Sequence, residues 1–332
     1  MHDRFETTAR IAGIGTYLPE RVLTNADLEK MVETSDEWIT TRTGIKERHV
    51  VAEGEALVDL VERAGKAAMA DAGVAAEEID LFLLATATLE QPIPASSSIA
   101  QPRLGVVNAA CLDVSAACSG FVYALNVARQ FIATGEAKNV LVVGGECLTR
   151  YTDWTDRSTC VLFGDGAGAV VLQPAPAGEG ILQCAWKTDG TYADLISMPG
   201  GGCRIPPWDR EAIDRRLPFI KMRGNEVFKV AVRALTEISN EVMQRAGITV
   251  DDLALFVPHQ ANLRIIKAVG SRLKMPDEKV FTNVQWVGNT SAASIPLALG
   301  QAVEQGRIQR GDLVLSSAFG GGFTWASILF RY

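Results

Sequence analysis

The chain has 332 residues, 48% of them hydrophobic and 21% charged, which is a globular composition with room for one large domain or two of ordinary size. No apolar run reaches the roughly 18 residues that span a bilayer, and the charged start at residues 1–6 does not fit a signal peptide. The net charge of −7 argues against nucleic acid as a partner, and six cysteines without metal-type or disulfide-type spacing favour a reducing cytoplasm and no bound metal.

A short helix is predicted after Thr34, because Thr34 and Glu37 have the spacing of a capping box. Trp38 and Arg42 are four residues apart and therefore share one face of that helix. Such a pair can serve as a stacking platform for a base or a peptide, or Trp38 can simply cover the core. His49 follows in a charged segment that we expect to be exposed.

An internal repeat runs through the chain. Residues 69–82 and 243–256 share the pattern Ala-Gly-apolar, two acids, apolar and Leu-Phe, at an offset of 174 residues. With a two-residue slip the repeat continues at residues 135–143 and 306–316. A repeat at half the chain length indicates a duplicated α/β unit.

Each copy alternates strands with helices, which predicts a largely parallel sheet in each half. We place the halves at residues 1–173 and 174–332, joined by the Pro- and Gly-rich segment 173–180. The Gly-rich segment 162–170 runs into a strand, whereas a phosphate loop would open a helix. It therefore predicts close packing of the backbone.

Cys118 lies between an apolar strand-like run at residues 106–112 and a long apolar helix at residues 121–133. A thiol at a helix N-terminus faces unpaired N–H groups and the positive end of the helix dipole. These can lower its pKa and supply a thiolate nucleophile. The alternative is an inert buried cysteine, the common fate of free cysteine. The other cysteines lack the helix-start context, Cys111 and Cys160 being in strand-like runs.

Three features of the second half are candidates to act with Cys118. His259 follows a strand predicted at residues 253–257, and ligands of open α/β sheets bind beyond the carboxyl ends of strands. Asn289 precedes the helix that the repeat pairs with the helix behind Cys118, although an N-cap or turn role alone would explain it. Residues 320–322 are glycines after a strand, which suits an oxyanion hole or a tight chain reversal.

Seven motifs together form the pattern of a known family, at residues 34–45, 116–121, 163–169, 222–228, 257–264, 288–294 and 319–325. On these motifs the whole chain resembles β-ketoacyl-acyl-carrier-protein synthase III, the initiating condensing enzyme of type II fatty-acid synthesis in the thiolase superfamily. The resemblance implies an α/β fold, the thiolase-like five-layered αβαβα arrangement of two pseudo-symmetric halves. It also implies a homodimer with no tightly bound cofactor.

The resemblance implies a catalytic triad of Cys118, His259 and Asn289. Cys118 takes an acyl group from an acyl-CoA substrate, and the backbone N–H groups of Cys118 and Gly321 hold the oxyanion. Malonyl-acyl-carrier protein then loses CO₂, and its enolate attacks the acyl-cysteine to give a β-ketoacyl product. His259 and Asn289 donate hydrogen bonds to the malonyl thioester oxygen. A thiolase must deprotonate a substrate carbon and uses a second cysteine for this. An asparagine such as Asn289 therefore favours decarboxylative condensation.

Ligand contacts also follow from the resemblance. Trp38 and Arg157 are expected to sandwich the adenine of CoA. Further CoA contacts are expected from Thr34, Arg42, Asn225, Asn262 and Arg264. The acyl pocket is expected to include Ile93, Phe163, Phe228 and Phe319. Docking of the acidic carrier protein needs a local basic patch on this acidic chain, expected from Lys229, Arg264, Lys267, Arg272 and Lys274, unless these residues form only a solvated charged face.

Two residues depart from the family pattern. Ile93 stands where acetyl-primed relatives carry a bulky aromatic side chain that reaches the acyl pocket of the partner subunit. A smaller side chain favours a longer or broader starter. It keeps open a same-fold acyltransferase or ketosynthase of a secondary-metabolite pathway. Arg223 stands near the CoA tunnel where a small residue is common, and its effect is open.

Overall fold

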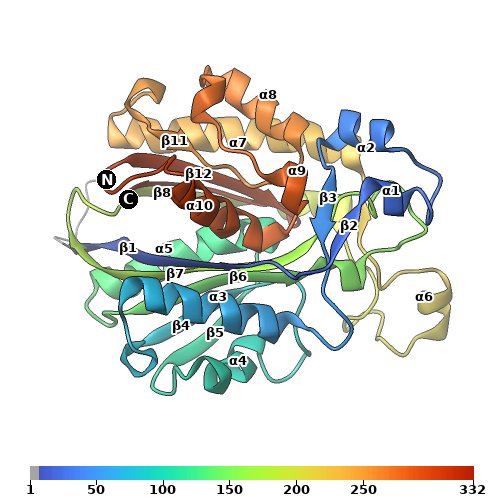
Figure 1. Ribbon diagram of the computed structural model, residues 1–332, viewed down its shortest axis with the longest axis horizontal. Helices are drawn as coiled ribbons and strands as arrows, with labels where there is room; N and C mark the ends of the chain where they lie inside the picture. The colour runs from blue at the N-terminus through green and yellow to red at the C-terminus, as the bar shows by residue number, and fades with distance from the viewer. Residues whose placement is uncertain (1–6) are drawn as a thin grey trace.

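The computed structural model describes residues 7–332 (Figure 1). The charged start of the chain, for which we expected no signal peptide, lies outside the described residues. The helices are α1 Asn25–Leu28, α2 Asp36–Thr43, α3 Leu57–Ala72, α4 Ser96–Leu104, α5 Gly120–Ala133, α6 Arg210–Asp214, α7 Gly224–Ala246, α8 Leu263–Leu273, α9 Val284–Val287 and α10 Ser294–Glu304. Within residues 7–332 no helix is both long and apolar enough to cross a membrane.

Two sheets form the centre of the molecule. The first has the strand order β1-β7-β6-β4-β5, with bounds β1 Thr7–Tyr17, β4 Leu81–Ala85, β5 Ala110–Val114, β6 Val140–Cys147 and β7 Asp165–Pro176. The second has the order β11-β12-β13-β8, with bounds β8 Ile181–Thr188, β11 Leu255–Phe256, β12 Leu313–Gly320 and β13 Thr324–Arg331. Two small ribbons pair β2 Val22–Thr24 with β3 Glu47–His49 and β9 Ile196–Ser197 with β10 Lys221–Met222.

The buried side chains define five layers. Along β4, Leu83 packs with α5 and α10 between the two sheets, whereas its neighbour Leu84 packs with α3 and α4 on the outer face. Successive strand residues point to opposite faces, so both faces of this sheet are covered. Helices α7 and α8 cover the outer face of the second sheet (Figure 1). The predicted αβαβα arrangement is confirmed.

Both sheets are mixed, so the prediction of largely parallel sheets is wrong. In the first sheet β7 is antiparallel to both β1 and β6, and in the second β13 is antiparallel to both β12 and β8. The pairs β4–β6, β4–β5 and β11–β12 are parallel. Antiparallel neighbours need no crossover helix, and β12 and β13 are joined by only residues 321–323.

The repeat is visible in the backbone. Gly73 and Gly247, 174 positions apart, end α3 and α7 with φ of 64° and 70°. Ala117 and Ser291, also 174 apart, have φ of 46° and 49° in the short 3₁₀ turns η2 (Ala117–Ser119) and η7 (Ser291–Ala293). Each turn is followed directly by a central helix, α5 after η2 and α10 after η7. The two sheets also share one order when β1, β7, β6 and β4 are matched to β8, β13, β12 and β11.

The boundary between the halves at residues 173 and 174 stays a prediction. Strand β7 continues past it to Pro176, and the chain turns at residues 177–180 before β8. The Gly-rich segment is closely packed, as predicted. A Cβ on Gly168 would lie 2.7 Å from the Pro296 Cβ, so α10 lies directly against β7 at this point.

Three local predictions are wrong. The strand predicted at residues 106–112 is β5, which begins only at Ala110, because a turn follows the left-handed Gly105 that ends α4. Cys160 lies in a turn instead of a strand. Ser35, not Thr34, caps α2, since its side chain accepts a hydrogen bond from the backbone N–H of Trp38 at 3.1 Å.

The charged segment around His49 was also expected to be exposed, but Arg48 is fully buried. Its guanidinium donates to the carbonyl oxygens of Leu23 and Val161 at 3.1 and 2.8 Å and to Asn25 Oδ1 at 2.9 Å. Burial lowers the Arg48 pKa to about 10. The charge is held by neutral acceptors from segments that lie far apart in the sequence.

Candidate active site

The structure brings Cys118, His259 and Asn289 to one cavity of about 640 Å³. Eight other residues named from the sequence also line it: Trp38, Arg42, Asn225, Phe228, Lys229, Asn262, Arg264 and Phe319. Among the described residues, those named from the sequence that do not line it are Thr34, Ile93, Arg157, Phe163, Lys267, Arg272, Lys274 and Gly321. The cavity at Cys118, the candidate nucleophile, is therefore lined by residues from both halves of the chain.

Cys118 follows a residue with an unusual backbone. Ala117 has a left-handed φ of 46°, which for an L-residue with a Cβ costs roughly 1–2 kcal/mol. Thr324 from β13 stabilises this turn, because its hydroxyl donates to the Ala116 carbonyl at 2.9 Å. The Ser119 hydroxyl lies 2.8 Å from the same carbonyl and 2.6 Å from Thr324 Oγ1. The turn thus holds Cys118 at the entry to α5.

The last residue of β12 lies directly beside the nucleophile. A Cβ on Gly320 would lie 2.6 Å from the backbone nitrogen of Cys118 and 3.1 Å from that of Ser119. Real Cβ atoms do not approach so closely, so only glycine fits here without a shift. The backbone leading to Gly321 is therefore brought next to the Cys118 N–H.

The pKa of Cys118 differs from the expectation. Burial raises the pKa of this thiol to about 12, and the nearby buried carboxyl of Glu146 raises it further, whereas the Ser291 hydroxyl lowers it. The expected lowering by the start of α5 is therefore wrong for this structure, in which desolvation dominates. The thiol is the stable form at neutral pH, so attack by sulfur requires an acceptor for its proton.

His259 is buried at the end of the β11 segment. Its backbone N–H donates to the Ser317 carbonyl at 2.8 Å, which continues the pairing with β12 beyond Phe256. The imidazole Nδ1 lies 2.5 Å from Ser294 Oγ. Burial lowers the His259 pKa to about 3, so the ring is neutral at pH 7. A neutral imidazole has one donor and one acceptor nitrogen.

Asn289 is held by its own backbone. Its N–H donates to the Leu162 carbonyl at 2.9 Å, and its carbonyl accepts from the Gly164 N–H at 3.0 Å. The side-chain Oδ1 accepts from the Ser291 N–H at 2.9 Å. This local bond is the turn role that the sequence left open. It also leaves the amide NH₂ as the donor group of the side chain.

Trp38 and Arg42 line the cavity, and Arg157, which does not line it, also approaches the Trp38 ring. The guanidinium carbons of Arg42 and Arg157 lie 4.5 and 5.1 Å from the centre of the Trp38 ring. Arg157 also donates to the Glu33 carbonyl at 3.1 Å. A base stacked between two planes needs them about 7 Å apart, twice the carbon contact distance. The expected sandwich of Trp38 and Arg157 therefore requires Arg157 to move.

Asn262 and Arg264, two of the remaining CoA-contact candidates, have structural partners, whereas the Thr34 side chain has none among residues 7–332. Asn262 caps α8, accepting from the Arg264 N–H at 2.8 Å, and its amide donates to the Arg42 carbonyl at 3.2 Å. It therefore ties α8 to α2. The Thr34 hydroxyl is buried with no partner within residues 7–332. The Arg264 guanidinium lies 5.4 Å from the centre of the Phe228 ring.

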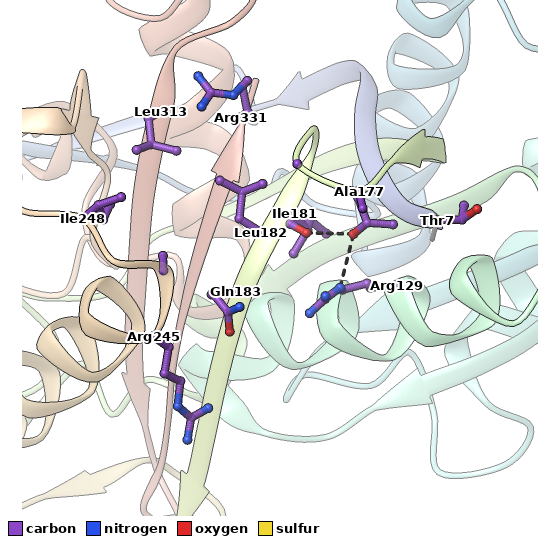
Figure 2. A pocket seen from close by; sticks show the side chains of 13 residues that line it. Thr7, Arg129, Ala177, Ile181, Leu182, Gln183, Arg245, Ile248, Leu313 and Arg331 are labelled. Atoms are coloured by element: carbon purple, nitrogen blue, oxygen red, sulfur yellow. Dashed lines mark hydrogen bonds between the residues drawn. The ribbon is translucent and has the colours of Figure 1, made fainter. Parts of the chain in front are cut away.

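A second cavity, of about 330 Å³, is lined by Arg129, Arg245 and Arg331 (Figure 2). Arg129 donates to Thr8 Oγ1 at 3.3 Å, and Arg245 pairs with Glu241. Figure 2 shows Arg245 and Arg331 at opposite ends of the view, so these charges do not converge on one point. No residue named as a site candidate lines this cavity, which leaves the cavity at Cys118 as the functional candidate.

Comparison with known proteins identifies the family. The chain matches the model described as 3-oxoacyl-[acyl-carrier-protein] synthase III over residues 112–190, and its C-terminal model over residues 243–332. It is 51% identical over 324 residues to the β-ketoacyl-[acyl-carrier-protein] synthase III of Roseiflexus castenholzii, which covers 98% of both chains. The chain belongs to the β-ketoacyl-[acyl-carrier-protein] synthase III family.

Solved structures agree with this synthase III assignment. The crystal structure of the synthase from Aquifex aeolicus superposes with a TM-score of 0.91 at 48% identity, covering 98% of this chain and 100% of that one. A priming β-ketosynthase of the R1128 polyketide pathway superposes with a TM-score of 0.90 at 36% identity, covering 100% and 98%. The resemblance read from the seven motifs is confirmed. The chain is a condensing acyltransferase of the thiolase fold.

Three of the eight family-pattern residues that do not line the cavity have positions that bear on their expected roles. Ile93 is 84% exposed, close in the chain to α4. Phe163 is buried, and its backbone pairs with Asn289, so in this chain it supports the site from behind. Lys274 is the residue after α8 and has a left-handed φ of 57°, so the helical geometry that carries Arg264 and Lys267 ends before it.

Several residues that line the cavity were not predicted from the sequence. Ile196 and Met222 come from the ribbon β9–β10, which has too few residues to give a periodic signal. Leu235 lies on α7 beyond Phe228 and extends the apolar side of the cavity. Ser294, which contacts His259 but does not line the cavity, belongs to a motif used for the resemblance and was not singled out. The sequence feature that could have identified Ser294 was its position at the start of the helix that follows Asn289.

Proposed function

We propose that this chain catalyses the decarboxylative Claisen condensation of an acyl-CoA starter with malonyl-acyl-carrier protein. The products are β-ketoacyl-acyl-carrier protein, CO₂ and CoA, and the reaction initiates fatty-acid synthesis. One observation carries the proposal: a cysteine at the start of a buried helix shares one cavity with a neutral histidine and an asparagine amide. The names of its synthase III relatives describe the same chemistry.

In the first half-reaction the sulfur of Cys118 attacks the thioester carbonyl of the acyl-CoA. A carbon–sulfur bond forms to Cys118, the bond to CoA breaks, and the thiol proton leaves with CoA. Solvent carries that proton from Cys118 to the departing CoA sulfur, because burial keeps the pKa of His259 too low for its ring to hold the proton. The backbone N–H groups of Cys118 and Gly321 are the proposed oxyanion donors, which the close approach of Gly320 to Cys118 supports.

In the second half-reaction malonyl-acyl-carrier protein loses CO₂, and the electron pair of the broken bond forms an enolate. The amide NH₂ of Asn289 and one ring N–H of His259 donate to the enolate oxygen. The enolate carbon attacks the acyl-cysteine, and Cys118 leaves as the thiolate and takes a proton from solvent. Because loss of CO₂ creates the carbanion, no strong base is required. Two neutral donors suit this task.

The proposed ligand contacts follow the polar side of the cavity. Trp38, Arg42 and Arg264 line it beside Asn225, which fits the phosphate and base of CoA. The basic residues proposed to dock the carrier protein are Lys229, Arg264, Lys267, Arg272 and Lys274, all exposed. Lys229 and Arg264 reach the cavity itself, so this patch borders the entrance that a carrier-bound malonyl group would use.

We also propose a homodimer that acts in the cytoplasm. Strand β5 has a free edge, and Leu112 on it is 38% exposed beside Val107, which is 61% exposed. Exposed apolar residues near an open strand edge favour pairing with another chain. Ile93 is proposed to enter the acyl pocket of the partner subunit. All six cysteines are free, as a reducing compartment requires.

A longer acyl starter, as in a secondary-metabolite pathway, is the second candidate. The likeness to a priming β-ketosynthase of a polyketide pathway favours it, as does the modest size of Ile93. Both candidates share the chemistry at Cys118 and differ in the starter alone.

The test is the intact mass of the protein after incubation with acyl-CoAs from acetyl to dodecanoyl, with Cys118→Ala as the control. We expect one acyl adduct, absent from Cys118→Ala, and a β-ketoacyl product when malonyl-acyl-carrier protein is added. The preferred chain length separates the two candidates. Absence of an adduct with every CoA would refute the proposed priming step. An adduct without condensation would refute the second half-reaction.

A further inference from the structure

A serine outside the triad contacts His259. Ser294 is the first residue of α10, and its Oγ lies 2.5 Å from Nδ1 of the imidazole. Both residues are buried, with 1% and 4% of their surfaces exposed. The roles assigned above to Cys118, His259 and Asn289 do not include this contact.

The bonds around Ser294 determine which nitrogen of His259 carries the proton. The Gln260 N–H points to Ser294 Oγ at 3.3 Å, so the serine oxygen accepts there. In the described chain, residues 7–332, the only other partner of this hydroxyl is His259 Nδ1. The serine O–H therefore donates to Nδ1. In a neutral imidazole an accepting Nδ1 leaves the proton on Nε2.

The direction of the Gln260 N–H is itself fixed. The Gln260 side chain donates to the carbonyls of Pro258 and Phe281 at 2.7 and 3.2 Å and accepts from the Asn283 N–H at 3.0 Å. Gln260 is 1% exposed. These three bonds hold the segment that carries His259, so the Ser294 oxygen meets a donor in a constant position.

The internal repeat shows that the fold does not need this hydroxyl. The position 174 residues before Ser294 is Gly120, the first residue of α5. Both helices begin after the same left-handed turn, yet the first copy has no side chain at this point. The start of the helix therefore does not require a serine at this position. The contact with His259 gives the serine a reason to be there.

We propose that Ser294 is a positioning residue that holds His259 in the tautomer with the proton on Nε2, so that a donor N–H faces the cavity shared with Cys118 and Asn289. The inference rests on the proposed function, because the decarboxylation step needs a donor toward the enolate oxygen. With the proton on Nδ1, the ring would present a lone pair to that oxygen and oppose the developing charge.

The first test is the tautomer itself. The chain has three histidines, so ¹⁵N-histidine labelling with a His259→Gln variant assigns the resonances of His259. We expect a protonated Nε2 and an unprotonated Nδ1 in the wild-type protein at pH 7, and loss of this single pattern in Ser294→Ala. A protonated Nδ1 in the wild-type protein would overturn the proposal, even if the variant failed to fold.

The second test separates the two half-reactions. In Ser294→Ala we expect the acyl adduct on Cys118 to form, while the rate of CO₂ release from malonyl-acyl-carrier protein falls by about tenfold to a hundredfold, somewhat less than for loss of a whole oxyanion donor. Ser316→Ala is the matched control, because Ser316 is a buried serine whose hydroxyl has no partner among residues 7–332. It should keep the wild-type rate.

The outcomes are distinguishable from failure of the proposed function. If the wild-type protein forms the adduct but releases no CO₂, the proposed function is wrong whatever Ser294 does. If the wild-type protein condenses and Ser294→Ala releases CO₂ at the wild-type rate with an unchanged tautomer pattern, the role of Ser294 is wrong.

Discussion

Replacing Gly320 by alanine tests the approach of β12 to the nucleophile. The new Cβ would lie 2.6 Å from the Cys118 nitrogen, whereas ordinary contacts begin at 3.4 Å, so one backbone must move by about 0.8 Å. A misplacement of about 1 Å in a catalytic group can lower the rate about a hundredfold. Overpacking of this kind also costs about 1–3 kcal/mol of stability.

The assay is the rate of acyl-adduct formation on Cys118 by rapid quenching and intact mass, together with the melting temperature. We expect acylation to slow by about a hundredfold in Gly320→Ala, with the protein still folded. Gly190→Ala is the control, because a Cβ there meets nothing within 4 Å and the residue does not have a positive φ. An acylation rate within about threefold of the wild type would refute the reasoning, since at most about a quarter of the expected change in activation free energy would then be present.

Further predictions concern the two donors, the turn and the buried acid. Asn289→Ala should keep the acyl adduct but lower CO₂ release about a hundredfold or more, because one enolate donor is lost; equal loss of both steps would contradict this. Thr324→Val should lower stability by about 1–2 kcal/mol in urea unfolding and slow acylation, because the Ala116 carbonyl loses one of its two hydroxyl donors and Ser119 loses its contact with Thr324; wild-type values for both would contradict it. Burial raises the Glu146 pKa from 4.5 to about 7, so folding holds a proton that the unfolded chain releases and stability falls as pH rises from about 4.5 to 7. Glu146→Gln should therefore flatten the melting temperature over this range, and an unchanged slope would exclude the shift.

The sequence predicted those parts of the site that depend on local pattern and on the repeat. The offset of 174 residues paired the helix after Cys118 with the helix after Asn289, and the structure brings Cys118 and Asn289 to one cavity. The apolar run at residues 121–133 predicted a long apolar helix, and α5 packs in the core between the two sheets. The His259 position followed from its place after a strand.

What the sequence could not supply came from contacts across long separations. The Cys118 pKa was predicted in the wrong direction because its enclosure involves Gly320, some two hundred residues later. Arg48 was expected to be exposed because its charged neighbours dominate the local pattern. Its acceptors, the Leu23 and Val161 carbonyls, come from other segments and appear only in the fold.

The matched left-handed turns at Ala117 and Ser291 have a consequence for how the two halves share the reaction. The residue after each turn is Cys118 in one half and Ala292 in the other, so a scaffold with two equivalent places for a nucleophile uses only one. Ala292 is 1% exposed, buried against the first turn. In the proposed reaction each chain therefore carries one acyl group, on Cys118. The half that has Ala292 at the equivalent place would supply His259 and Asn289, so one half would attack the acyl group and the other would stabilise the enolate.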